Sequence, residues 1–322
     1  MRPAYHLVYF LVLSLVASGC TGFINKADSL PPIEWDAKAI ELTTTPFFPQ
    51  TQYQCGPASL ATVLKASGLN IDAATLVGEV YIPDRKGALQ VEMIAAVRRH
   101  GRTPYQIDND LQSIIDQLRH GLPVLVLLTL GYSALPVYHY AVVIGYEPDS
   151  DSLIMRSGED YRLLMSRHQF LSAWSKSGNW ALAVPSPGKL PANVNVERYL
   201  GAVIALESVG QWHAAQQSYL SVLSKWPENT LARFGLANSL RSQGKLTEAV
   251  DQYRQVLKQD TDHRPARNNL ADTLLRLGRC DDALSVLEPA LINNASQADT
   301  DKAANMTRIE IQEACPDTPA MQ

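Results

Sequence analysis

Residues 53–64 read YQCGPASLATVL, and residues 138–146 read YHYAVVIGY. In the first stretch Cys55 stands directly before a run whose apolar positions, Leu60, Val63 and Leu64, share one helical face. Pro57 falls in the first turn, where the missing N–H of proline costs nothing. We therefore expect Cys55 to begin a helix, where unpaired N–H groups and the helix dipole favour a thiolate.

The second stretch is a predicted strand that His139 opens. Period-two alternation places Ala141 and Val143 on the same face as His139, and Tyr140 and Val142 on the other. The other six histidines fall in the first residues, near predicted helix ends or in the C-terminal region: His6, His100, His120, His168, His213 and His263. A thiol at a helix start and an imidazole on a rigid strand are what nucleophilic thiol chemistry requires.

The elements around this pair predict an α+β domain over residues 46–187. Four predicted helices come first, at 55–67, 72–80, 90–99 and 108–120. Residues 123–128 form a continuous apolar run, which is typical of a strand buried on both faces. Shorter predicted strands follow at 138–146, 152–155, 161–165 and 180–184. Helices followed by strands are typical of the α+β class.

The pattern Gln-x4-Cys-Gly-Pro-Ala-Ser-Leu-Ala from Gln50, followed by His-Tyr-Ala-Val-Val-Ile-Gly-Tyr, resembles the papain-fold cysteine peptidases related to bacteriocin-processing, double-glycine leader peptidases. The resemblance implies that Cys55 attacks a peptide carbonyl, while His139 activates the thiol and protonates the leaving amine. It also implies that Gln50 supports the oxyanion, with Gln52 and Gln54 as competitors for that role.

The orienting partner of the histidine departs from the family pattern. In the family an Asp, usually before a Pro, occupies the next strand; here Ser157 stands at that position, and Glu159 or Asp160 could substitute from the turn. A thiol needs less help than a hydroxyl, so a weaker third member is compatible with activity. No metal-ligand spacing or phosphate-binding glycine loop occurs, so neither metal nor cofactor is expected.

The first residues predict export. Arg2 precedes an apolar stretch from Leu7 to Ala17, too short for a confident membrane span, and small residues lead to Cys20. This resembles the bacterial lipoprotein processing site, which implies a signal peptide over 1–19, a lipid on Cys20 and a tether over 20–45. Thr21 after the cysteine, by the same resemblance, favours the outer membrane of a Gram-negative envelope, facing the periplasm. A net charge of -4 without a basic stripe argues against a nucleic-acid partner.

After a Pro- and Gly-marked linker at 188–195, the sequence repeats. Gly210, Gly244 and Gly278 are spaced by 34 residues, and an Ala follows each of them after five residues. This resembles the tetratricopeptide repeat (TPR), an all-α solenoid, with three units over 196–297. Val203 replaces the small residue expected in the first unit. A capping helix is expected at 298–315, with Asn305, Thr307 and Gln312 on its polar side, before a tail at 316–322.

The four cysteines are expected to have different states. If Cys20 is acylated, three thiols remain. Cys280 lies at the turn of the third unit and Cys315 at the equivalent turn after the cap, and stacked units place such turns side by side. We therefore expect a Cys280–Cys315 disulfide and a free Cys55.

Together these features predict a cell-envelope cysteine peptidase that hydrolyses a protein or peptide substrate, with repeats that dock a substrate or partner. Two alternatives remain at this point: a decayed peptidase-like scaffold, and a thiol-dependent acyl transferase, which shares the acyl-enzyme with a peptidase.

Overall fold

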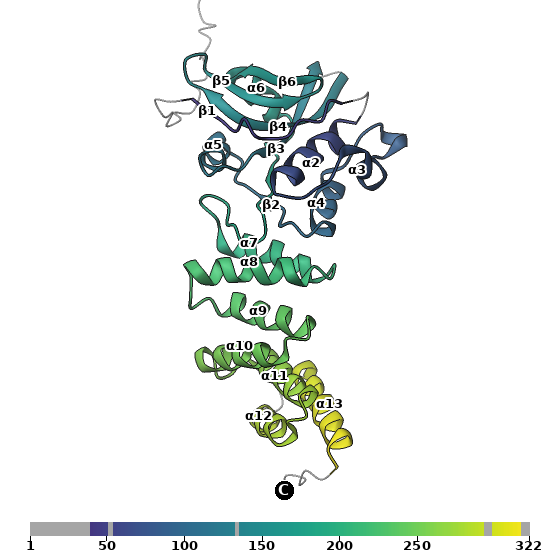
Figure 1. The fold of residues 1–322 in the computed structure, drawn as a ribbon, viewed down its shortest axis with the longest axis vertical. Helices are drawn as coiled ribbons and strands as arrows, with labels where there is room; N and C mark the ends of the chain where they lie inside the picture. Colours follow the sequence, from purple (N-terminus) through teal and green to yellow (C-terminus); the bar gives the residue numbers. More distant parts are fainter. Residues whose placement is uncertain (1–38, 51–53, 133–134, 293–297, 317–322) are drawn as a thin grey trace, which may run out of the picture. The chain divides into compact units, whose positions relative to one another are not determined.

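The computed structural model describes residues 39–50, 54–132, 135–292 and 298–316. The predicted signal peptide, the lipidation site Cys20 and most of the tether lie outside these residues. The first domain is built on an antiparallel sheet with the order β2-β7-β3-β4-β5-β6, and β1 pairs with β4 (Figure 1). The strands are β1 Ile40–Glu41, β2 Tyr105–Gln106, β3 Val124–Tyr132, β4 Leu135–Glu147, β5 Ser152–Ser157, β6 Asp160–Ser166 and β7 Ala181–Ala183.

Helices cover both faces of this sheet. On one face, α2 (Cys55–Ala66), α3 (Ala73–Val80) and α4 (Gln90–Arg99) form a core with alternate residues of β3 and β4 such as Leu125 and Tyr140. The intervening residues of β3 are equally buried, on the face that α5 (Leu111–Arg119) and α6 (Arg167–Ser175) contact. Burial on both faces explains why residues 123–128 read as an unbroken apolar run.

Several bounds differ from the sequence-based expectation. β4 begins at Leu135, so His139 lies inside this strand and does not open it. The domain begins before residue 46, because β1 pairs with the end of β4 at Gly145 and Tyr146. Gly145 is required there, since a Cβ at this position would overlap the carbonyl of Ile40. The pairing depends on main-chain hydrogen bonds over two residues, and so leaves no pattern in the sequence. β2 was also not expected, because it is only two residues long.

The first helix is buried all round, which corrects the expectation of a single apolar face. Every residue from Gly56 to Leu64 is buried, including the polar Ser59 and Thr62. Their hydroxyls donate to main-chain carbonyls, Ser59 to Tyr140 (3.1 Å) and Thr62 to Ala58 (3.0 Å). The small and polar residues of this helix therefore permit close packing between the sheet, α3 and α4 rather than marking a solvated side.

The second region consists of paired helices. They are α7 Val196–Glu207, α8 Trp212–Lys225, α9 Thr230–Ser242, α10 Leu246–Gln259, α11 Arg264–Arg276 and α12 Cys280–Ile292. Gly210, Gly244 and Gly278 each end the first helix of a pair with φ between +72° and +76°, a conformation that glycine adopts without a Cβ penalty. This requirement explains the 34-residue period of glycine.

The linker and the cap are both held by specific contacts. In the predicted linker, the Gln117 amide exchanges two hydrogen bonds of 3.0 Å with the main chain of Ala192. The cap is α13, Ala298–Ala314. Thr307 was expected on the polar side of this helix, but it is buried. Its hydroxyl donates to Asn268 of α11 (2.9 Å). The prediction from its hydrophilic side chain was wrong because its buried partner is itself a polar side chain.

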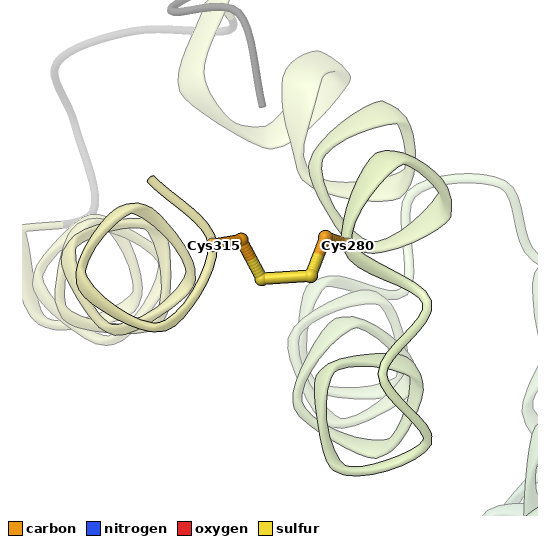
Figure 2. The surroundings of a disulfide bond; sticks show 2 residues. All are labelled: Cys280 and Cys315. Carbon is orange, nitrogen blue, oxygen red and sulfur yellow. A yellow bond between two sulfur atoms is a disulfide. The ribbon is translucent and has the colours of Figure 1, made fainter. Parts of the chain in front are cut away.

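A disulfide joins Cys280, the first residue of α12, to Cys315, which follows α13, as Figure 2 shows. The bond closes a loop with a sequence separation of 35 and a Cα–Cα distance of 6.2 Å. Cys55 is the free cysteine of the described residues. The disulfide therefore fastens the terminal helix to the last repeat.

Replacing both cysteines, Cys280→Ser with Cys315→Ser, is expected to lower the free energy of opening of α13 by up to about 4 kcal/mol, because the unfolded loop regains its entropy. Hydrogen exchange of the α13 amides measures this opening. Reduced wild-type protein is the matched control and should exchange like the double variant. Unchanged exchange in both would show that packing alone holds the cap.

Candidate active site

Cys55 lies at the start of α2, against the edge of β4. Its thiol is half-buried, and the N–H groups of Tyr140, Gly56 and Cys55 itself point their positive ends toward the sulfur. Gly56 permits this arrangement, since a Cβ there would come within 2.6 Å of the Ala88 Cβ. Tyr140 also donates its hydroxyl to the Ala88 carbonyl (3.3 Å), which fixes the loop over the helix start.

His139 contacts the third candidate directly. Its Nε2 lies 2.8 Å from the Oγ of Ser157, the last residue of β5. Ser157 is 7% exposed, so this hydrogen bond is partly buried. Asp160 and Glu159 are exposed at the turn that follows, and the bond to Nε2 comes from the serine. The bond leaves Nδ1 as the ring nitrogen that can accept a thiol proton.

Burial decides the protonation of the pair. It raises the pKa of the Cys55 thiol above its ordinary value of 9.0, and the three N–H groups only partly offset this effect. Burial also lowers the pKa of His139 below 6.5. Both side chains are therefore neutral at pH 7. This corrects the expectation that the helix start holds a thiolate in the resting protein, because desolvation outweighs the main-chain N–H groups.

Gln50 is the glutamine that the structure places at the site. It lines the same cavity as Cys55 and His139, and its main-chain N–H donates to the Gly158 carbonyl (3.2 Å). Gln54 instead precedes α2, where its carbonyl accepts from the Ala58 N–H (3.2 Å). Gln52 lies outside the described residues.

Gln50, Cys55 and His139 line one cavity of about 670 Å³. One wall is the segment 85–90, and the other is residues 136–140 of β4, with Leu127 of β3 between them. Sequence reasoning missed the first wall. The available signal was Gly56 inside a helix, since a glycine at such a position indicates that another segment approaches closely.

A known protein family matches most of the first domain. The model of the Peptidase_C39 like family matches residues 42–182. The first domain is similar to the C39-like peptidase family. Two tetratricopeptide repeat models match residues 200–264 and 240–304 of the helical region. The α+β peptidase fold followed by TPR helices, expected from the sequence, is thereby confirmed.

Solved structures similar to the chain include two peptidase structures and one chaperone. A C39-like peptidase from Bacillus anthracis is 16% identical, with 48% of this chain and 99% of that chain covered and a TM-score of 0.39. The peptidase domain of Streptococcus ComA, a bifunctional ABC transporter involved in a quorum-sensing pathway, is 24% identical, with 44% and 99% covered and a TM-score of 0.36. The type III secretion translocator chaperone SycD of Yersinia enterocolitica is 15% identical, with 37% and 82% covered and a TM-score of 0.35.

No curated protein matches the chain. Across the part of the chain that the structure describes, no three His, Cys, Asp or Glu side chains lie close enough to hold a metal ion. Within those same residues, the helices are too short or too polar to span a bilayer.

Proposed function

We propose that the protein is a cysteine peptidase that cleaves a protein or peptide substrate through an acyl-enzyme on Cys55. The observation that carries this proposal is that Cys55 and His139 line one cavity, with Ser157 on the Nε2 of the imidazole. A nucleophile, a base and a group that orients the base are the parts that thiol catalysis requires.

In the proposed first step, His139 Nδ1 takes the proton of the Cys55 thiol as sulfur attacks the peptide carbonyl. Throughout, Nε2–H donates to Ser157 Oγ, which fixes the tautomer. The main-chain N–H of Cys55 and the amide of Gln50 stabilise the oxyanion. The imidazolium then protonates the leaving amine, and water, deprotonated by the same nitrogen, hydrolyses the thioester.

Trapping the intermediate tests the proposal. Full-length protein is mixed with a p-nitrophenyl ester, quenched in acid, digested and analysed by mass spectrometry. We expect one acyl group on the peptide that contains Cys55. An unmodified Cys55 peptide, with intact protein and ester in excess, would contradict the proposal.

The neutral resting pair predicts the pH dependence of kcat/KM. Activity requires neutral His139, so on the acid side it should fall as pH drops through the pKa of His139, which burial holds below 6.5. The raised pKa of Cys55 keeps the thiol protonated up to pH 9.0, so activity should form a plateau between these two values. Ester hydrolysis, measured at about twenty pH values between pH 4 and pH 10, gives the profile and its two expected limbs. An acid limb above pH 7 would contradict the assigned protonation states.

Ser157 should limit the rate because it is neutral. Ser157→Ala removes a hydrogen bond worth about 1 kcal/mol, which predicts up to about a tenfold loss of kcat/KM. Ser157→Asp should raise the pKa of His139, shift the acid limb to higher pH and increase the plateau rate, since a carboxylate stabilises the imidazolium. Ser157→Asn is the matched neutral control, and equal profiles for the Asn and Asp variants would show that charge at this position has no influence.

Ser157 also favours a second candidate, a peptidase-like scaffold that binds a peptide in the cavity without cleaving it. A cell whose deletion phenotype is restored equally by wild-type and Cys55→Ala protein would support the scaffold. Acyl transfer is the remaining alternative, and it differs from hydrolysis in whether an added amine captures the acyl group.

We further propose that the protein is exported and lipid-anchored at Cys20, in the outer membrane facing the periplasm, and that its repeats bind a protein partner. The Ala-Ser-Gly-Cys sequence at 17–20 supports the anchor, and the Cys280–Cys315 disulfide supports an oxidising compartment. Labelled palmitate should enter wild-type protein but not Cys20→Ala, and equal incorporation would contradict the anchor.

A further inference from the structure

Arg156 is a buried cation directly before Ser157, and it is 2% exposed. Its guanidinium donates to main-chain carbonyls of two separate segments. Nε and Nη2 lie 3.3 and 3.1 Å from the Thr45 oxygen, Nη2 lies 3.3 Å from the Thr43 oxygen, and Nη1 donates to the Tyr161 carbonyl. A buried guanidinium requires such acceptors, and here they tie residues 43–45 to the β5–β6 hairpin.

An aromatic stack extends this contact toward Gln50. The Arg156 Cζ lies 3.7 Å from the centre of the Tyr161 ring. The Phe47 ring meets Tyr161 edge to face, with a centroid distance of 5.7 Å and an interplanar angle of 87°. Three residues later, the Gln50 N–H donates to Gly158 (3.2 Å). The segment from Thr43 to Gln50 is thus held by the end of β5, the turn after it and the start of β6.

The two last residues of β5, Arg156 and Ser157, lie where the pairing of β5 with β6 is irregular, and they contact different partners. Ser157 contacts the base, His139, and Arg156 contacts the segment that carries Gln50. We propose that Arg156 is a positioning residue that fixes Gln50 for oxyanion stabilisation. This inference rests on the proposed peptidase function.

The geometry specifies arginine rather than any cation. Five N–H donors in a planar fork can reach three carbonyls while the plane stacks on an aromatic ring, whereas a lysine ammonium provides neither the fork nor the stacking plane. Arg156→Lys therefore keeps the charge and removes the placement of Thr43 and Thr45.

The experiment compares two reactions of Cys55 in the full-length protein. With a p-nitrophenyl ester, sulfur forms a thioester bond to the acyl carbon, the ester C–O bond breaks, p-nitrophenolate leaves, and the thiol proton passes to His139. This reaction develops an oxyanion, and alkylation by iodoacetamide does not. We expect Arg156→Lys to slow acylation by about 10- to 100-fold through the acylation rate constant, with ester affinity nearly unchanged. Alkylation, measured at the same pH, should stay within about twofold of the wild type.

A double-mutant cycle then tests whether Arg156 acts through Gln50. Gln50→Ala should slow acylation by about 10²-fold, and adding Arg156→Lys to Gln50→Ala should slow it by less than about twofold more. Multiplying effects would overturn the inference, as would equal losses in acylation and alkylation, which would indicate a merely structural role.

Two further variants keep the test decisive if Arg156→Lys does not fold. Tyr161→Leu removes the stacking ring at a residue that is 55% exposed, and it should lower acylation selectively in the same way. Arg162→Lys alters an exposed neighbour whose Nε bonds Glu41 of β1 (3.0 Å), and it should leave acylation unchanged. Acylation at the wild-type rate in Tyr161→Leu and in every folded Arg156 variant would overturn this inference alone, whereas a wild-type protein without an acyl-enzyme would overturn the proposed function.

Discussion

Cys55→Ala is expected to lower kcat/KM by at least about 10⁴-fold and to abolish acylation, because Cys55 is the one thiol among the described residues that line the cavity. The oxyanion donors and the substrate cavity remain in this variant, so any residual rate reports what they contribute alone. Hydrolysis of a p-nitrophenyl ester measures the loss, and mass spectrometry of the digested protein shows which residue carries the acyl group.

The Cys280→Ser/Cys315→Ser variant is the matched control for this prediction. It removes two other cysteines that the structure places in a disulfide beside the cap. We expect its acylation rate to equal that of the wild type. Acyl groups that persist in Cys55→Ala at the wild-type rate would place the nucleophile elsewhere and contradict the assignment.

His139→Ala is expected to lower kcat/KM by about 10³-fold at pH 7. The reason lies in the pKa of Cys55, which burial raises above 9.0, so almost no thiolate forms without a base. The deficit should shrink as pH rises toward 10, because hydroxide then replaces the imidazole in removing the thiol proton. Ester hydrolysis as a function of pH measures both effects.

His168→Ala provides the control, since His168 is exposed on α6 and does not line the cavity. Its rate should match that of the wild type. Added imidazole should restore part of the His139→Ala rate, because the deleted side chain leaves space in the cavity. A His139→Ala variant that retains the wild-type rate at pH 7 would exclude this residue as the base.

The elements that position the pair could be predicted from the sequence. Pro57 and the apolar periodicity predicted a helix that begins at Cys55, and α2 begins at that residue. The alternation around His139 predicted its strand, and Tyr140, Val142 and Ile144 lie together in the core on the other face. Both patterns are local, since backbone geometry repeats every 3.6 or two residues and requires no knowledge of the partners.

The protonation of the pair could not be predicted in the same way. The helix start correctly indicated N–H groups near the Cys55 sulfur, but the depth of the site decides the sign of the pKa shift. Burial depends on residues 85–90 and on β4, which are remote in the sequence. The prediction that Thr307 lies on the polar side of the cap was wrong for a related reason, because its partner Asn268 is a polar residue of another helix.

Local residue patterns were enough to predict the helix start at Cys55, the strand phase of His139 and the 34-residue glycine period, because each follows from local backbone geometry. Three contacts depend on packing instead: Ser157, rather than Asp160, bonds His139, Gln50 lines the cavity, and Arg156 ties β5 to residues 43–45. These contacts join residues from separate segments, so their distances depend on how the strands and loops pack. Spacing along the sequence limits which residues can reach the site, and the packing of the domain determines which of them do.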